Sequence, residues 1–173
     1  MKNNKLRYTV QAAVIAAAYA VLTMAIRPLG IADGAIQFRL SEALTILPVL
    51  THAAIPGLTI GCFVANLTSN SGPLDLVFGT FASLIAAVLT YLTRNIQYKG
   101  VPWLSSLFPV IVNAVVISWM LTFFVLEGEA SLNVFLFNAA TIGLGQMVCC
   151  VGGGLPLHAA LKNKNLGFRR EEN

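Results

Sequence analysis

Two charged residues stand three positions apart at the start of an apolar run, in the stretch AIQFRLSEALTILP from Ala35 to Pro48. Arg39 and Glu42 would share one face of a helix beginning there, and Gln37 precedes them as a further polar candidate. A carboxylate accepts two parallel N–H bonds, so Glu42 suits the donor edge of a flat heterocycle. Two roles stay open for the pair. Either Glu42 binds a ligand that Arg39 holds in place, or the two form an ion pair that fixes the preceding loop.

Other polar residues interrupt apolar segments further along the chain. Polar groups in a bilayer core are costly, so they usually face other helices or a cavity. Amides can bind carbonyl and ring nitrogen atoms, and an indole ring can stack on a heterocycle. The further candidate ligand contacts of these kinds are Asp75, Asn66, Asn113, Trp119, Asn138 and Gln146.

Five of these six residues also have a purely structural interpretation. Asp75 can cap a helix, and Asn66 can close a turn. Asn113 and Gln146 can form hydrogen bonds between helices, and Trp119 can anchor the chain at the membrane interface. A choice between the two kinds of role requires the positions of these side chains in space.

Composition identifies the environment in which these residues must work. The chain has 173 residues, of which 57% are hydrophobic and 10% charged, and its mean hydropathy is +0.76. Soluble domains carry about 25% charged residues. Long apolar runs, rather than alternation, predict an all-α integral membrane protein with one membrane domain over residues 1–173. The apolar run Val10 to Ile26 is longer than the apolar core of a typical signal peptide, and we expect it to stay as the first helix.

Basic residues decide the expected number of membrane helices. Nine of the eleven Lys and Arg residues form three clusters, near residues 2–7, 94–99 and 162–170. Cytoplasmic loops attract Lys and Arg. All three clusters lie inside only if the segment around residues 40–67 crosses twice. We therefore expect six helices, with both termini cytoplasmic and approximate spans of 9–27, 40–53, 55–71, 74–94, 101–126 and 132–161.

Small residues form a stripe on the expected first helix. Ala12, Ala16 and Ala20 recur every four residues, and so do Ala13 and Ala17. Such spacing lets another membrane helix approach closely. The stripe is a candidate partner interface, and the alternative is packing within this chain.

Motifs for other kinds of chemistry are missing from the sequence. The three cysteines have no zinc-ligand spacing, and no P-loop, HExxH or nucleic-acid motif is present. We therefore expect no catalytic residue, no metal and no cofactor. His52 and His158 lack the partners that an intramembrane enzyme would need.

Four stretches together resemble the QueT family over nearly the whole chain. They are IQFRLSEALTILP (36–48), DLVFGT (75–80), FPVIVNAVV (108–116) and IGLGQ (142–146). The resemblance implies an S component, the substrate-binding subunit of an energy-coupling factor (ECF) importer in a prokaryotic plasma membrane. The implied ligand is a queuosine precursor, that is, a 7-deazaguanine such as queuine.

The resemblance also implies partners: a transmembrane coupling subunit, which the first helix contacts, and two ATPase subunits that hydrolyse ATP. Three alternatives remain from the sequence. The chain is an S component for another vitamin such as riboflavin, biotin or thiamin, an intramembrane enzyme, or an assembly scaffold.

Overall fold

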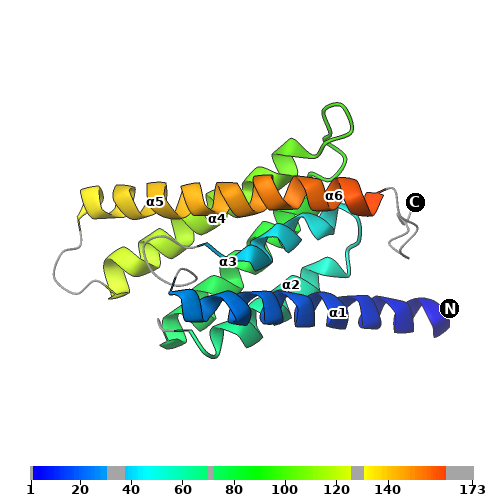
Figure 1. The fold of residues 1–173 in the computed structure, drawn as a ribbon, viewed down its shortest axis with the longest axis horizontal. Helices are drawn as coiled ribbons and strands as arrows, with labels where there is room; N and C mark the ends of the chain where they lie inside the picture. Colours follow the sequence, from blue (N-terminus) through cyan, green and yellow to red (C-terminus); the bar gives the residue numbers. More distant parts are fainter. Residues whose placement is uncertain (1, 31–37, 70–71, 126–130, 163–173) are drawn as a thin grey trace.

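The fold is helical, as the sequence predicts. The computed structural model describes residues 2–30, 38–69, 72–125 and 131–162 (Figure 1). Within these ranges the only pairing of extended backbone is one isolated bridge between Tyr98 and Val101. The all-α prediction is therefore confirmed for the described part of the chain.

Ten consecutive helical elements make up this part of the chain. They are α1 (Lys2–Ile26), η1 (Arg27–Leu29), η2 (Leu40–Val49), α2 (Ala54–Asn66), α3 (Gly72–Leu92), α4 (Trp103–Met120), η3 (Leu121–Val125), α5 (Leu132–Met147), η4 (Val148–Gly153) and α6 (Gly154–Lys162). The elements η1 and η2 are 3₁₀ helices, and η3 and η4 are π-helical. The π-helical turns continue their neighbours, so 103–125 and 132–162 are each one uninterrupted helix.

Four of these helices are long and apolar enough to cross a membrane: Asn4–Leu29, Gly72–Leu92, Trp103–Val125 and Leu132–Lys162. Two shorter apolar helices, η2 and α2, lie between the first and second of them. With rises of about 2.0 Å and 1.5 Å per residue, each of the short helices is about 20 Å long. A typical hydrocarbon core is about 30 Å thick.

The element η2 differs most from the sequence prediction of a helix over 40–53. It is a ten-residue 3₁₀ helix that ends at Val49. Pro48 lies inside it and has no N–H to donate to a preceding turn. The amides of Leu50 and Thr51 both bond to the carbonyl of Leu47, which closes this helix before α2 begins.

One end of the bundle gathers the basic residues. The His52 ring lies 4.9 Å from the ring of Tyr8 and 6.3 Å from that of Tyr91. Lys162 Nζ donates to the Gly100 carbonyl at 3.1 Å. These contacts join the start of α1, the η2–α2 turn, the α3–α4 loop and the end of α6. We call this the basic end, because it also carries Lys5, Arg7, Arg94 and Lys99.

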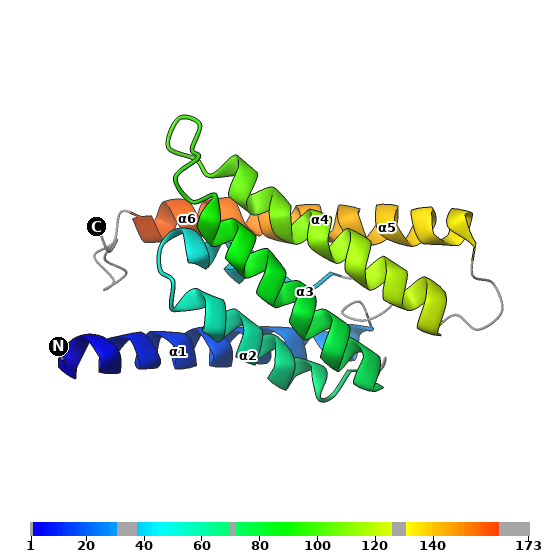
Figure 2. The same cartoon turned by 180° about the vertical axis from the view of Figure 1, so that it is seen from behind.

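The start of α1 and the end of α6 lie at the same end of the molecule in both views (Figures 1 and 2). Helices α1 and α5–α6 run along opposite edges, with α3 and α4 crossing one face between them (Figure 2). Successive elements α1, η2, α2, α3, α4 and α5–α6 run alternately toward and away from the basic end.

Helices α1 and α2 meet through small residues. A Cβ atom on Gly61 would lie 2.8 Å from the Ala16 carbonyl oxygen, and one on Gly57 would lie 2.9 Å from that of Ala12. These glycines therefore allow the two backbones to touch. Ala12 and Ala16 thus take part in packing within the chain, which was the alternative to a partner interface.

The alanines of α1 divide between two faces. Ala20 is buried, and Ala12 and Ala16 are partly buried. Ala13 and Ala17 are exposed, as are Val14 and Val21 beside them. The helix therefore has one face committed to α2 and η2, and an opposite apolar face without cover from the described residues.

The centre of the bundle is occupied by η2. It contacts α1, α2, α3, α4, η4 and α6. Gly153 and Gly154 let the η4–α6 backbone approach Ala43, since a Cβ on Gly153 would lie 3.0 Å from the Ala43 Cβ. Seven of the ten η2 residues are buried. Polar residues at the start of η2 are therefore held inside the bundle, at the end of η2 that lies farther from the basic end.

Candidate functional site

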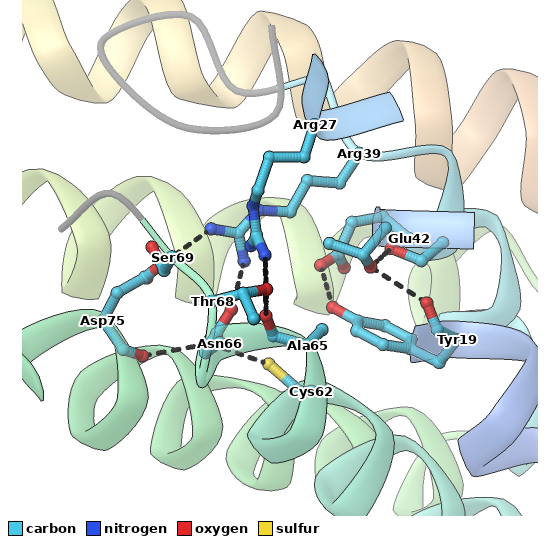
Figure 3. A network of polar contacts seen from close by, with 12 residues as sticks. Tyr19, Arg27, Arg39, Glu42, Cys62, Ala65, Asn66, Thr68, Ser69 and Asp75 are labelled. Carbon is cyan, nitrogen blue, oxygen red and sulfur yellow. Dashed lines mark hydrogen bonds and ion pairs between the residues drawn. The ribbon is translucent and has the colours of Figure 1, made fainter. Parts of the chain in front are cut away.

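Glu42 lies in the first turn of η2 and is 2% exposed. Tyr19 of α1 donates its hydroxyl to Glu42 Oε1 at 2.7 Å, and Asn113 of α4 donates Nδ2 to Oε2 at 3.5 Å. The Thr45 hydroxyl donates to the Glu42 carbonyl at 2.6 Å. The carboxylate is thus held between α1 and α4 by neutral donors. Figure 3 shows its contact with Tyr19.

Arg39 pairs with Asp75 rather than with Glu42. Arg39 Nη2 lies 2.9 Å from Asp75 Oδ2, and the two side chains are 4% and 1% exposed. The prediction of an Arg39–Glu42 ion pair required both residues to be helical. Arg39 instead precedes η2 with extended backbone (φ −110°, ψ 107°), and its side chain reaches the start of α3 (Figure 3). The ion-pair alternative for Arg39 and Glu42 is therefore wrong.

Asn66 completes the surroundings of this ion pair from the end of α2. Its Nδ2 donates to the Asp75 carbonyl at 3.0 Å, and its Oδ1 accepts from Arg39 Nη1 at 3.4 Å. A Cβ on Gly79 would lie 2.6 Å from Asn66 Nδ2 and 3.1 Å from Asp75 Oδ1. Gly79 therefore provides the space in which Asn66 and Asp75 meet.

A second arginine holds the same turn, and the sequence analysis did not identify it. Arg27, just after α1, donates Nη1 to the Ala65 carbonyl at 2.8 Å and also to the Thr68 hydroxyl. Ser69 donates its hydroxyl to Asp75 Oδ2. The α2–α3 turn is thus tied to α1 and to η2 by two guanidinium groups. The available signal was an arginine directly after a long apolar run.

Gln146 and Asn138 lie apart from the two carboxylates. Gln146 Oε1 lies 3.4 Å from Cys150 Sγ, to which the Thr45 hydroxyl points at 3.7 Å. Gln146 is thereby linked to η2 through two side chains. Asn138 Nδ2 donates to the Thr122 hydroxyl at 3.1 Å, which is a hydrogen bond between α5 and η3. Both amides are buried.

Trp119 joins a surface cluster instead of the polar network. It is 44% exposed, and its ring lies 5.9 Å from that of Phe78 and 5.3 Å from that of Phe124. No described contact connects it to Glu42 or Asp75. Gln37 lies outside the described residues.

Tyr19 is the contact to Glu42 that the sequence analysis missed. It is fully buried, within the alanine-rich part of α1. A tyrosine is the only hydrogen-bonding side chain in AVIAAAYAVL, and buried tyrosines usually find a partner for the hydroxyl. That signal was available, but it did not identify the partner.

The two carboxylates differ in how their charge is compensated. Asp75 has a buried guanidinium at 2.9 Å, and its Oδ1 points into the contact with Gly79. Glu42 is held by a hydroxyl and an amide. A carboxylate offers about four lone-pair sites, so two donors leave Glu42 able to accept more. Among the described residues, no three His, Cys, Asp or Glu side chains group as metal ligands would.

The Arg39–Asp75 pair predicts a stability effect that a double-mutant cycle can measure. Asp75→Asn leaves the buried guanidinium without its counter-charge and should lower the free energy of unfolding by about 3–5 kcal/mol. Adding Arg39→Met removes the stranded charge and should restore part of the loss. Thermal unfolding of the detergent-purified variants measures both effects. Losses that simply add would contradict a direct interaction.

Comparison with known proteins identifies the family. A family model described as QueT transporter matches residues 9–163. The chain is 35% identical over 85 residues to a protein of Lactococcus lactis subsp. cremoris (strain MG1363) named Queuosine precursor transporter QueT. That alignment covers 49% of this chain and 50% of the relative, so the chain spans about half the length of the curated relative it matches. No solved structure matches the chain. Since the family model covers most of its residues, the protein belongs to the QueT transporter family.

Proposed function

We propose that the protein is the substrate-binding S component of an ECF importer and that it captures a queuosine precursor from outside the cell. Family membership supports a role in transport, and the name of the Lactococcus relative, Queuosine precursor transporter QueT, supports this class of ligand. The partner subunits, in this proposal, hydrolyse ATP. The protein itself is a binding subunit and not an enzyme.

The single observation that carries the proposal is the buried Glu42 carboxylate with neutral hydrogen-bond donors on both oxygens. The base of a 7-deazaguanine presents N1–H and a 2-amino group side by side. Those two donors match the two oxygens of one carboxylate. Asn113, already at Oε2, is placed to contact the adjoining carbonyl edge of the ring.

Glu42 is a better candidate than Asp75 for this role. A ligand at Asp75 would compete with a guanidinium and with the Ser69 hydroxyl for Oδ2. Oδ1 of Asp75 is buried near Gly79 and accepts no hydrogen bond from the described residues. Arg39 and Asp75 therefore act, in this proposal, as the support of the site. Asn66 belongs to the same support.

Glu42→Gln tests the carboxylate directly. It replaces one acceptor oxygen by an amino group and removes the charge. Hydrogen bonds to charged groups contribute about 1.5–3 kcal/mol, so affinity for 7-deazaguanine should fall about 10- to 100-fold. Isothermal titration of the purified variant measures this, with its melting temperature as the folding control.

Unchanged affinity in a folded variant would refute the role of Glu42. Tight binding of riboflavin or biotin by the unmodified protein, with no binding of 7-deazaguanine, would instead refute the ligand class.

The proposed orientation places the basic end in the cytoplasm. Six basic residues of the described chain lie there, Lys2 at the start of α1 among them, and loops rich in Lys and Arg stay inside. The carboxylates lie toward the opposite end, which in this proposal faces outward. If the short helices η2 and α2 each cross the bilayer once, the chain crosses it six times.

Cysteine labelling from the outside tests this orientation. The native cysteines 62, 149 and 150 are buried, so the unmodified chain is a suitable background. A membrane-impermeant maleimide should label Leu132→Cys, at the start of α5, in intact cells. It should label Lys99→Cys and Lys162→Cys only after the membrane is opened. Labelling of Lys162→Cys in intact cells would contradict the orientation.

The exposed face of α1 is the proposed contact for the coupling subunit. Ala13 and Ala17 lie on it, flanked by Val10, Val14 and Val21, which are 52%, 62% and 64% exposed. Small residues at four-residue spacing let a partner membrane helix approach closely. Ala12, Ala16 and Ala20, on the other side, contribute to packing within this chain instead.

Two neighbouring substitutions separate the faces of α1. Ala17→Leu should abolish most uptake in cells that carry the complete transporter, while affinity for 7-deazaguanine and the melting temperature stay unchanged. Ala16→Leu should lower the melting temperature, because Gly61 leaves no space beside Ala16. Normal uptake by Ala17→Leu would exclude this face as the interface.

A further inference from the structure

Helix α1 holds the start of η2 through two buried hydroxyl groups. Tyr19 donates to Glu42 Oε1 at 2.7 Å, and Thr23, one turn later, donates to Ser41 Oγ at 2.7 Å. Tyr19, Thr23 and Ser41 are all fully buried. Two adjacent residues of η2 are thus fixed by two residues on one face of α1.

Of the two donors to the Glu42 carboxylate, Tyr19 makes the shorter hydrogen bond. The Asn113 contact is 3.5 Å long, beyond the usual 2.7–3.2 Å range for an N–H donor, whereas the phenol contact has the usual O–H length. A short bond from a hydroxyl to an ionised acceptor is the stronger kind. Tyr19 therefore has the larger share in setting the direction of the carboxylate.

The Tyr19 hydroxyl does not exclude a ligand from the oxygen that it contacts. Each carboxylate oxygen has two lone-pair sites, so Oε1 can accept from the phenol and from a ligand N–H together. Two parallel ligand donors require the carboxylate plane to be aligned with the base. A phenol that fixes this plane in advance spares the ligand the cost of ordering it.

We propose that Tyr19 is a positioning residue for Glu42, and that it makes recognition of the ligand's donor edge depend on the position of α1. This inference rests on the proposed function. Tyr19 itself need not touch the ligand. Its effect reaches the ligand through the orientation of the carboxylate.

The same helix presents its other face outward. Ala17, two residues before Tyr19, is exposed, while Tyr19 is 0% exposed. Against α2 the helix packs closely on glycines: a Cβ on Gly57 would lie 3.0 Å from the Ile15 side chain, and one on Gly61 would lie 2.8 Å from the Tyr19 Cβ. Since Tyr19 belongs to α1, a displacement of this helix relative to η2 would move the Tyr19 hydroxyl relative to Glu42.

Two matched bases test the positioning role. 7-Deazaguanine has the 2-amino donor, and 7-deazahypoxanthine lacks only that group. In the unmodified protein we expect 7-deazaguanine to bind about 10- to 100-fold more tightly, since the second donor meets a charged acceptor. In Tyr19→Phe, which keeps the ring and removes the hydroxyl, this ratio should fall to below about threefold, mainly through weaker binding of 7-deazaguanine.

Thr23→Val is the matched control. It removes the other buried hydroxyl link between α1 and η2, one turn away, without touching Glu42. It should lower the melting temperature about as much as Tyr19→Phe, yet keep the affinity ratio of the unmodified protein. The ratio reports recognition of one donor, so general loosening of the bundle does not change it selectively.

The affinity ratios of Tyr19→Phe and Thr23→Val distinguish a positioning role from general packing. A ratio in Tyr19→Phe equal to that of the unmodified protein would overturn the positioning role while leaving the proposed function intact. An equal drop in Thr23→Val would also overturn it, because the effect would then belong to general α1–η2 packing. If the unmodified protein bound neither base, the proposed function would fail, and this inference with it.

Discussion

The buried ion pair between Arg39 and Asp75 is the interaction on which the central part of the bundle depends. It connects the residue before η2 to the first turn of α3, with both side chains almost fully excluded from solvent. In a bilayer neither charge can remain there alone, since each would carry an uncompensated desolvation cost. The start of η2, the α2–α3 turn and the start of α3 must therefore come together as one unit, which Asn66, Ser69 and Gly79 complete.

The Arg39–Asp75 pair also gives Asp75 and Glu42 different kinds of partner. The Arg39 guanidinium bonds to Asp75 rather than to Glu42. The Glu42 carboxylate therefore accepts hydrogen bonds from neutral side chains of α1 and α4. The two acids thus differ in their partners: Asp75 forms an ion pair with a guanidinium, and Glu42 accepts from a hydroxyl and an amide. The 3₁₀ form of η2 contributes to this difference. Its first residue follows an extended Arg39, which points away from the helix that begins after it.

Much of this arrangement was readable in the sequence, and the limits are physical. Hydropathy and length identified the long helices, and costly polar residues in apolar runs identified Glu42, Asp75, Asn66 and Asn113 as buried participants. The sequence did not show which polar side chains contact each other, because such contacts join segments far apart in the chain, as between Asn113 and Glu42. The same-face argument for Arg39 failed at the helix boundary, which sequence patterns locate poorly. The role of Trp119 was not readable either, because an aromatic residue suits a surface cluster, where it lies beside Phe78 and Phe124, as well as a binding site.

The short central elements have a consequence for the surrounding lipid. Helices η2 and α2 match a hydrocarbon layer of about 20 Å, whereas the 25 residues of α1 extend over about 37 Å. Hydrophobic mismatch of this size is normally relieved by thinning of the bilayer or by tilting of the helix. Here η2 is shielded by its helical neighbours on several sides, so its ends meet protein more than acyl chains. The short length of η2 is therefore accommodated by neighbouring helices, which surround its polar start in place of lipid.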